Sequence, residues 1–148
     1  DRYYVPLIIN DRLDICLAVD AAGVHLGQTD LPCSEARRIL GAEKIIGVSA
    51  ATPEEAAKAQ SDGADYLGVG AVFATSTKTN TRPVTAETIR AIRSAVDIPF
   101  VVIGGVNSEN ISGLHGLGIN GAAVISAIIS QPDITAAARK MRQAAERL

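Results

Sequence analysis

A short apolar run followed by a longer amphipathic stretch occurs six times along the chain, and this repeat constrains the fold most. The apolar runs cover residues 6–10, 24–27, 45–49, 66–73, 100–105 and 122–128. They are rich in Val and Ile and alternate little with polar residues, as is typical of parallel strands buried on both faces. The stretches at 53–63, 85–96 and 132–148 have helical spacing, and Thr52 and Thr85 are placed to cap the first two. The repeat predicts one α/β domain over residues 1–148.

Alternating strands and helices build either an open doubly wound sheet or a closed barrel. The strand starts at 6, 24, 45, 66, 100 and 122 are 18, 21, 21, 34 and 22 residues apart, and no Gly-x-Gly-x-x-Gly follows the first strand. Both observations favour a TIM (β/α)8 barrel over a nucleotide-binding sheet. Such a barrel has eight βα units. We therefore expect that the first two are missing before Asp1, in keeping with the absence of an initiator Met.

Composition favours small-molecule partners. The chain is 47% hydrophobic with a net charge of −2, and it has no basic stripe that would attract nucleic acid. No apolar stretch approaches the roughly 18 residues of a membrane span. Cys16 and Cys33 lie in apolar or helical patterns, so we expect buried thiols and a cytoplasmic protein. The oligomeric state stays open, a homo-oligomer included.

Two carboxylates follow the first two predicted strands, where a barrel of this kind places its active site. Asn10 and Asp11 follow the first strand, and Asp30 lies just beyond the second. Because neighbouring strands lie about 4.8 Å apart, Asp11 and Asp30 can converge on one Mg²⁺. The alternative is that both only cap the helices that follow them.

The connection at residues 74–84 is the longest and is almost entirely polar. Thr75, Thr77 and Lys78 lie together in it and favour an anion-binding loop at the barrel mouth, although a flexible connector would have the same composition.

Residues after the last two strands fit a phosphate site. Gly104 and Gly105 follow one strand, while Ile125 and Ser126 lie near the end of the other. Backbone N–H groups of these two loops commonly bind phosphate in such barrels. The two glycines alone would mark only a tight turn, but their pairing with the Ser126 segment favours phosphate binding.

A nucleophilic triad is not indicated. Ser49 ends its strand inside the predicted mouth and could donate a hydrogen bond to a ligand, but it lacks an obvious base. His25 lies in a strand and His115 in a helical segment, so both are expected to be structural.

Together these junctions resemble the thiamine-phosphate synthase family over essentially the whole chain. The matching strings are IINDR at 8–12, GVHLGQTD at 23–30, GVSA at 47–50, YLGVGAVFATSTKTNTRP at 66–83, VIGGVN at 102–107 and VISAI at 124–128. The resemblance implies a transferase that joins a pyrimidine diphosphate to a thiazole phosphate. In this family the diphosphate leaves first and the thiazole nitrogen captures the resulting cation.

The resemblance also implies residue roles. Asp11 and Asp30 would bind Mg²⁺, and Asn10 and Lys78 would contact the diphosphate, with Ser49 beside the pyrimidine. Lys78 and Ser49 would be the catalytic residues. The thiazole phosphate would be held by Thr75, Thr77, Gly105, Ile125 and Ser126. The Gln-x-Arg segment that follows the family's second strand has no counterpart here, which puts the activity of this chain alone in doubt.

Two alternatives remain. A related thiazole tautomerase shares the barrel and the phosphate site, but it would need an acid/base group for which the sequence offers no strong candidate. A non-catalytic barrel fragment that binds a phosphate ligand is the other.

Overall fold

The computed structural model describes residues 3–74, 82–146 and 148. Six parallel strands form one sheet in chain order. The strands are β1 (Ile8–Asn10), β2 (Gly23–Leu26), β3 (Ile45–Ala50), β4 (Tyr66–Gly70), β5 (Phe100–Ile103) and β6 (Gly121–Ala123). The helices are α1 (Leu13–Ala18), α2 (Cys33–Leu40), α3 (Pro53–Ser61), α4 (Ala86–Ala95), α5 (Ser126–Ile129) and α6 (Ile134–Ala145), with a 3-10 turn, η1 (Ile111–Leu114).

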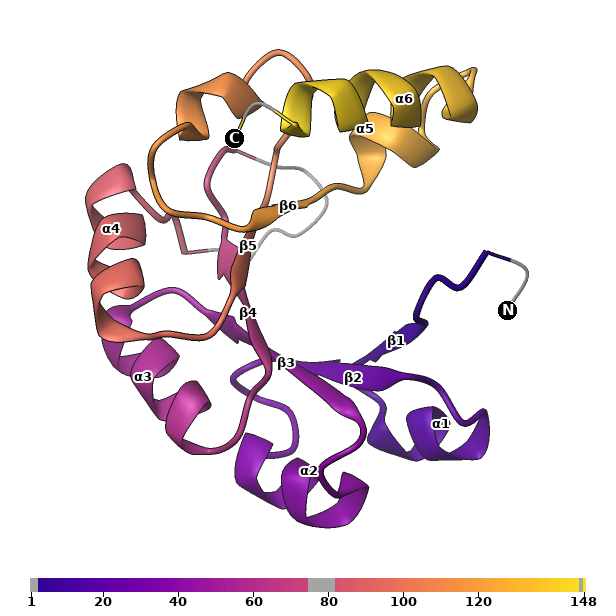
Figure 1. Ribbon diagram of the computed structural model, residues 1–148, viewed down its shortest axis with the longest axis vertical. Helices are drawn as coiled ribbons and strands as arrows, with labels where there is room; N and C mark the ends of the chain where they lie inside the picture. The colour runs from indigo at the N-terminus through magenta and orange to yellow at the C-terminus, as the bar shows by residue number, and fades with distance from the viewer. Residues whose placement is uncertain (1–2, 75–81, 147) are drawn as a thin grey trace.

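The sheet curls into a half-barrel (Figure 1). Helices α2, α3 and α4 cover its outer, convex side, and β1 and β6 lie at its two ends without pairing with each other. The predicted α/β class and the parallel strand order are therefore confirmed. The sequential order also brings the carboxyl ends of all six strands to one rim of the sheet, so the loops that follow them lie at that rim.

Short local signals set where the helices begin. Thr52 Oγ1 accepts a hydrogen bond from the Glu55 N–H at 3.2 Å, and Thr85 Oγ1 accepts one from the Thr88 N–H at 3.2 Å. Both predicted caps are confirmed. The capping oxygen satisfies a backbone donor that has no partner within the helix. In α6 the cap is Asp133, whose Oδ1 accepts from the Ala136 N–H at 2.9 Å.

Four strands, β2, β4, β5 and β6, end earlier than their apolar runs predicted, and the difference is largest for β4 and β6. β4 stops at Gly70 rather than Phe73, and β6 stops at Ala123 because the chain turns into α5 at Ser126. An apolar run indicates that residues are buried but not which backbone conformation they adopt. It therefore could not distinguish the end of a strand from the buried turn that follows it. Ser126 consequently opens a short helix instead of closing a strand.

One hydrophobic core lies between the sheet and its outer helices. The strands contribute fully buried Phe100, Ile46 and Leu67, and α4 contributes Ile89 and Ile92. Cys16 and Cys33 are buried free thiols, as predicted. None of the described helices is long and apolar enough to cross a membrane.

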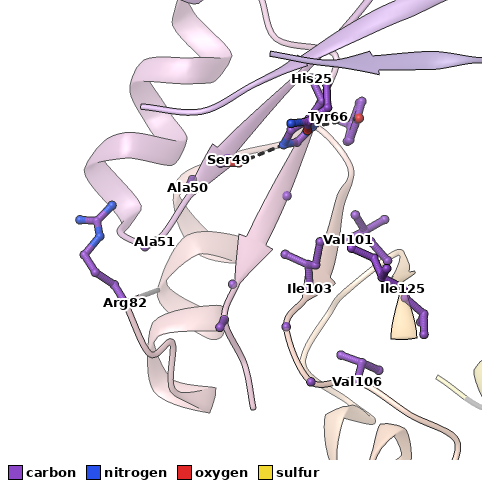
Figure 2. Close-up of a pocket in the computed structure, with 18 of the residues that line it drawn as sticks. His25, Ser49, Ala50, Ala51, Tyr66, Arg82, Val101, Ile103, Val106 and Ile125 are labelled. Atoms are coloured by element: carbon purple, nitrogen blue, oxygen red, sulfur yellow. Dashed lines mark hydrogen bonds between the residues drawn. The ribbon is translucent and has the colours of Figure 1, made fainter. Parts of the chain in front are cut away.

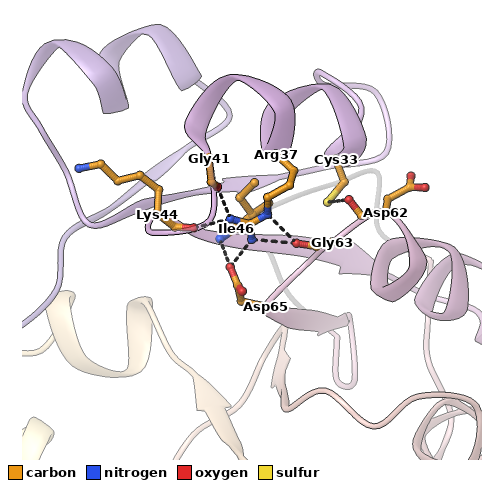
Figure 3. A network of polar contacts seen from close by, with 8 residues as sticks. All are labelled: Cys33, Arg37, Gly41, Lys44, Ile46, Asp62, Gly63 and Asp65. Atoms are coloured by element: carbon orange, nitrogen blue, oxygen red, sulfur yellow. Dashed lines mark hydrogen bonds and ion pairs between the residues drawn. The ribbon is translucent and has the colours of Figure 1, made fainter.

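The amino-terminal ends of the middle strands are joined by a polar network around Arg37 of α2 (Figure 3). The Arg37 guanidinium donates to the carbonyl oxygens of Gly41, Lys44 and Gly63 at 2.8 to 3.0 Å and to Asp65 Oδ2 at 2.6 Å. The same Asp65 oxygen accepts from the Ile46 N–H at 2.7 Å. One side chain thus ties α2 to the starts of β3 and β4, away from the rim where the loops gather.

Candidate active site

A cavity of about 450 Å³ opens at the carboxyl ends of the strands, and all six strands or the loops after them contribute to it (Figure 2). Much of its lining is backbone and small side chains, which leaves room for a ligand. Its polar and loop-derived lining residues include Asn10, His25, Gln28, Ser49, Tyr66, Arg82, Gly104, Gly105, Ile125 and Ser126. The structure therefore brings Asn10, Ser49, Gly105, Ile125 and Ser126 together, five residues that the sequence selected separately. Their individual roles remain predictions.

Ser49 is linked to a histidine that the sequence analysis had set aside. His25 Nε2 lies 3.0 Å from Ser49 Oγ, and His25 Nδ1 lies 3.0 Å from the Tyr66 hydroxyl. Ser49 thus has an imidazole neighbour that the sequence did not reveal. His25 lines the cavity as well. A Ser-His-Asp triad is nevertheless not formed by these residues, because the group bonded to His25 Nδ1 is a phenol.

Two glycines, Gly47 of β3 and Gly68 of β4, leave room for the Tyr66 and His25 side chains. A Cβ atom at Gly47 would lie 2.2 Å from the Tyr66 ring, and one at Gly68 would lie 2.9 Å from His25 Cε1. The His25 and Tyr66 rings lie with their centroids 5.5 Å apart and tilted by 40°. Burial raises the pKa of Tyr66, so its hydroxyl stays protonated at neutral pH.

The two predicted metal ligands follow neighbouring strands, as expected, but neither caps a helix. Arg12 occupies the cap position of α1 and Pro32 that of α2. Asp11 has a left-handed φ of 64°, and its N–H donates to the His25 carbonyl oxygen at 2.8 Å. Asp30 Oδ2 accepts from the Gly27 N–H at 2.6 Å, which closes the turn after β2. The helix-cap alternative is thus wrong for both residues, although Asp30 does have a turn-forming contact.

The donor set at Asp11 and Asp30 suits Mg²⁺ only with further ligands. Among the described residues, no group of three or more His, Cys, Asp or Glu side chains could hold a metal. Mg²⁺ usually takes one or two protein carboxylates and completes its shell with phosphate oxygens and water. Neither Asp11 nor Asp30 is among the residues that line the cavity, although Asn10 and Gln28, close to them in the chain, are. Two carboxylates fit Mg²⁺ here only where a bound phosphate and water complete its shell.

The paired glycines form a turn and also face the cavity. Gly104 and Gly105 have φ values of 99° and 65°, and the Gly105 carbonyl oxygen accepts from Asn110 Nδ2 at 2.9 Å. A Cβ at Gly105 would lie 2.4 Å from the Ala74 carbonyl oxygen, so only glycine fits. After the neighbouring strand β6, Ser126 is the first residue of α5, and the first N–H groups of a helix have no partner within it. Both loops therefore line the same cavity.

Thr75, Thr77 and Lys78 lie outside the described residues. The two ends of the connection that contains them meet at Ala71, whose N–H donates to the Arg82 carbonyl oxygen and whose carbonyl oxygen accepts from the Val84 N–H. Arg82 in turn donates to Glu55 Oε1 at 2.6 Å, while Glu55 Oε2 accepts from the Ala51 N–H. Ala71 and Arg82 both line the cavity, so the connection leaves from its rim and returns to it.

His25, Tyr66, Gln28 and Arg82 are the polar lining residues that sequence reasoning did not select. A signal existed for the first two: each is a polar or aromatic residue in a glycine-containing apolar strand. Strand register places Gly47 beside both His25 and Tyr66. Finding that signal required the register, which only the folded sheet supplies.

Comparison with known proteins gives concordant matches. A family model described as Thiamine monophosphate synthase matches residues 1–128. The chain is similar to the thiamine-phosphate synthase of Ruminiclostridium cellulolyticum, with 57% identity over 95% of this chain and 67% of that protein. The synthase of Clostridium botulinum is 50% identical over 99% of this chain and 69% of its own length. Among solved structures, thiamine phosphate pyrophosphorylase from Pyrococcus furiosus superposes with a TM-score of 0.89 at 41% identity, covering 98% of this chain and 69% of that one.

Proposed function

We propose the chemistry of this cavity from one premise: the chain belongs to the thiamine monophosphate synthase family. The protein is accordingly a transferase that joins hydroxymethylpyrimidine diphosphate to hydroxyethylthiazole phosphate, giving thiamine phosphate and diphosphate. The observation that carries the site assignment is that one cavity gathers residues from all six strands, including Asn10, Ser49, Gly105 and Ser126.

The reaction needs charge stabilisation rather than a protein nucleophile. The bond between the pyrimidine methylene carbon and the diphosphate oxygen breaks, and its electron pair leaves with the diphosphate. The thiazole nitrogen then uses its lone pair to form the new C–N bond. A tyrosine in the place where a triad would have its carboxylate supports this scheme, because a neutral phenol on His25 Nδ1 cannot stabilise an imidazolium cation as a carboxylate would.

The protein's residues have separate tasks in this proposal. Asn10 and Lys78 hold the leaving diphosphate, and Ser49 contacts the pyrimidine. Thr75, Thr77, Gly105, Ile125 and Ser126 hold the thiazole phosphate. The cavity position of Asn10, Ser49, Gly105, Ile125 and Ser126 supports their part, whereas Thr75, Thr77 and Lys78 are assigned by the family resemblance.

Asp11 and Asp30 would hold the Mg²⁺ ion. When bound, this ion neutralises negative charge on the diphosphate as it departs. The position of Asp11 and Asp30 after the paired strands β1 and β2 supports the assignment.

We also propose that the half-barrel belongs to a closed (β/α)8 barrel. The chain spans about two thirds of the length of the relatives it matches, 67% and 69% for the two named above. Within the described residues, strands β1 and β6 each pair on one side only. Two further βα units would pair with both strands and close the cavity wall between them.

The His25 imidazole lines the cavity and is a group of the kind that the tautomerase alternative needs for acid/base chemistry. The relatives at 50–57% identity are nevertheless named thiamine-phosphate synthases, and the transferase assignment follows them.

Replacing Asp30 with Asn tests the metal assignment. Asn keeps an oxygen that can accept from the Gly27 N–H, so the turn is retained while the ligand charge is lost. We expect thiamine phosphate formation to stop in excess chelator. In Asp30→Asn, the Mg²⁺ concentration for half-maximal rate should rise by about tenfold or more.

Glu43→Gln is the matched control, since it removes an exposed carboxylate from the connection before β3, at the opposite end of the strands. Its Mg²⁺ dependence should equal that of the unaltered protein. A normal rate in chelator, or an unchanged Mg²⁺ dependence in Asp30→Asn, would show that Asp30 serves only the turn.

A further inference from the structure

We propose that Tyr66 is a positioning residue that acts through His25 to make the Ser49 hydroxyl a hydrogen-bond donor toward the cavity. The inference deepens the proposed function and rests on it. Tyr66 Oη, His25 Nδ1, His25 Nε2 and Ser49 Oγ form a continuous chain with two 3.0 Å links across β4, β2 and β3 (Figure 2).

The direction of the hydrogen bonds follows from the chemistry at the Tyr66 end. Burial keeps Tyr66 a neutral phenol, and a half-buried phenol O–H needs an acceptor. His25 Nδ1 is in place to accept it. In a neutral imidazole the other nitrogen then carries the hydrogen, so His25 Nε2–H donates to Ser49 Oγ. The Ser49 oxygen is occupied as an acceptor, and its own O–H can donate into the cavity.

The direction of these hydrogen bonds is the reverse of that around a nucleophilic serine. There the histidine accepts the serine proton, and a carboxylate on the far side holds the histidine in the required tautomer. Here a phenol that donates to Nδ1 selects the opposite tautomer. Ser49 therefore acts as a donor to a polar substrate atom, which suits a reaction that needs no protein nucleophile.

The packing fixes the three groups in place. Gly47 and Gly68 leave the space that the Tyr66 and His25 rings fill, and any Cβ there would displace one of the rings. The Ser49 backbone is held independently, because Gln28 Nε2 donates to its carbonyl oxygen at 2.6 Å. With the backbone fixed, rotation about the Ser49 Cα–Cβ bond is the main freedom left, and the bond from His25 removes it.

A double-mutant cycle on the full-length protein tests the inference. Tyr66→Phe removes only the hydroxyl, and we expect kcat to fall about tenfold while the KM values change less than about twofold. Ser49→Ala should lower kcat at least as far. Adding Tyr66→Phe to Ser49→Ala should then cost almost nothing further, because a residue that acts through Ser49 has no effect once the hydroxyl is absent. Tyr4→Phe, which removes the hydroxyl of an exposed tyrosine, is the control.

The tautomer of His25 gives a second measurement that does not depend on turnover. In ¹⁵N-histidine-labelled protein at about pH 8, we expect the His25 signals to show a proton on Nε2 and a bare Nδ1, with exposed His115 as the internal reference. Tyr66→Phe should shift the His25 population toward the Nδ1–H form and leave His115 unchanged.

Each result bears on one of the two proposals. A proton on Nδ1 of His25 in the unaltered protein would overturn the positioning role. So would a Tyr66→Phe change that lowers kcat by the same factor in the unaltered protein and in Ser49→Ala. Failure of the unaltered protein to make thiamine phosphate would instead overturn the proposed function. The tautomer measurement would still show whether Tyr66 determines which nitrogen of His25 carries the proton.

Discussion

Glycine has different physical roles at different positions in this chain. Gly47 and Gly68 have ordinary strand backbones and are required because aromatic rings occupy the place of a side chain. Gly105 combines a left-handed φ of 65° with a close approach of the Ala74 carbonyl oxygen. Gly116 has a similar φ of 73°, but a Cβ atom at this position would have no other group within 4 Å. Backbone conformation and crowding can therefore be measured separately.

Comparing Gly105→Ala with Gly116→Ala separates the cost of backbone strain from the cost of steric crowding. Gly116→Ala should lower the free energy of unfolding by about 1 kcal/mol, the strain of a left-handed alanine. Gly105→Ala should lose about 2 to 3 kcal/mol, because steric overlap with Ala74 adds to the same strain. Urea denaturation of both variants gives the difference. Equal losses would show that the turn relaxes freely and that the close approach is unimportant.

Single residues also show which parts of the candidate site could be predicted from the sequence. Asn10, Ser49 and Gly105 were selected because each lies at the end of a strand, and the cavity contains all three. His25 was set aside because a histidine inside an apolar strand has no visible partner in the sequence. Its partners are 24 and 41 residues away along the chain.

At the scale of elements, Arg37 adds polar links between elements that also share the hydrophobic core. Its guanidinium satisfies three carbonyl oxygens where α2 ends, where β3 begins and where α3 turns into β4. Arg38, the next residue, is exposed and pairs with Glu35 within α2. A planar guanidinium with five donors can make such a set of bonds, whereas an ammonium cannot reach all of them.

Arg37→Lys should therefore lower the free energy of unfolding by about 3 kcal/mol, because several hydrogen bonds to a partly buried charged group are lost. Arg38→Lys is the matched control and should change it by less than about 0.5 kcal/mol. Thermal and urea unfolding curves measure both. A small loss in Arg37→Lys would mean that water replaces the guanidinium at these carbonyl oxygens.

Element boundaries show the limit of local patterns. Thr52 and Thr85 mark the starts of α3 and α4 correctly, because a cap is a contact within four residues. The ends of β4 and β6 were overestimated, because regular ladder pairing with β5 stops at Gly70 and Ala123 although the apolar residues continue. Pairing between distant segments determines that point.

At the scale of the whole molecule, the half-barrel formed by the described part of the chain has two strands with one unpaired edge each. β1 and β6 are three residues long, and Val5 and Leu7, just before β1, are exposed. β3 and β4 pair on both sides and carry the core. Stability should therefore fall from the centre of the sheet to its two ends.

Amide hydrogen exchange measures this gradient. In the 148-residue chain, we expect amides of β3 and β4 to be the most protected and those of β1 and β6 to exchange fastest. Extending the chain at its amino terminus by two βα units of a relative should raise protection in β1 and β6 most. If β1 is already as protected as β4, or if the added units change nothing, the closed-barrel proposal is contradicted.

The sequence by itself determined the repeating strand and helix units, the helix caps and the loops at the carboxyl ends of the strands. These follow from periodicity and from contacts between residues close in the chain. Only the tertiary structure decided how the sheet curls, which loops share the cavity, and that Tyr66, His25 and Ser49 form one hydrogen-bonded chain. Strand register sets those relations, and register arises from the packing of the whole sheet rather than from any one segment.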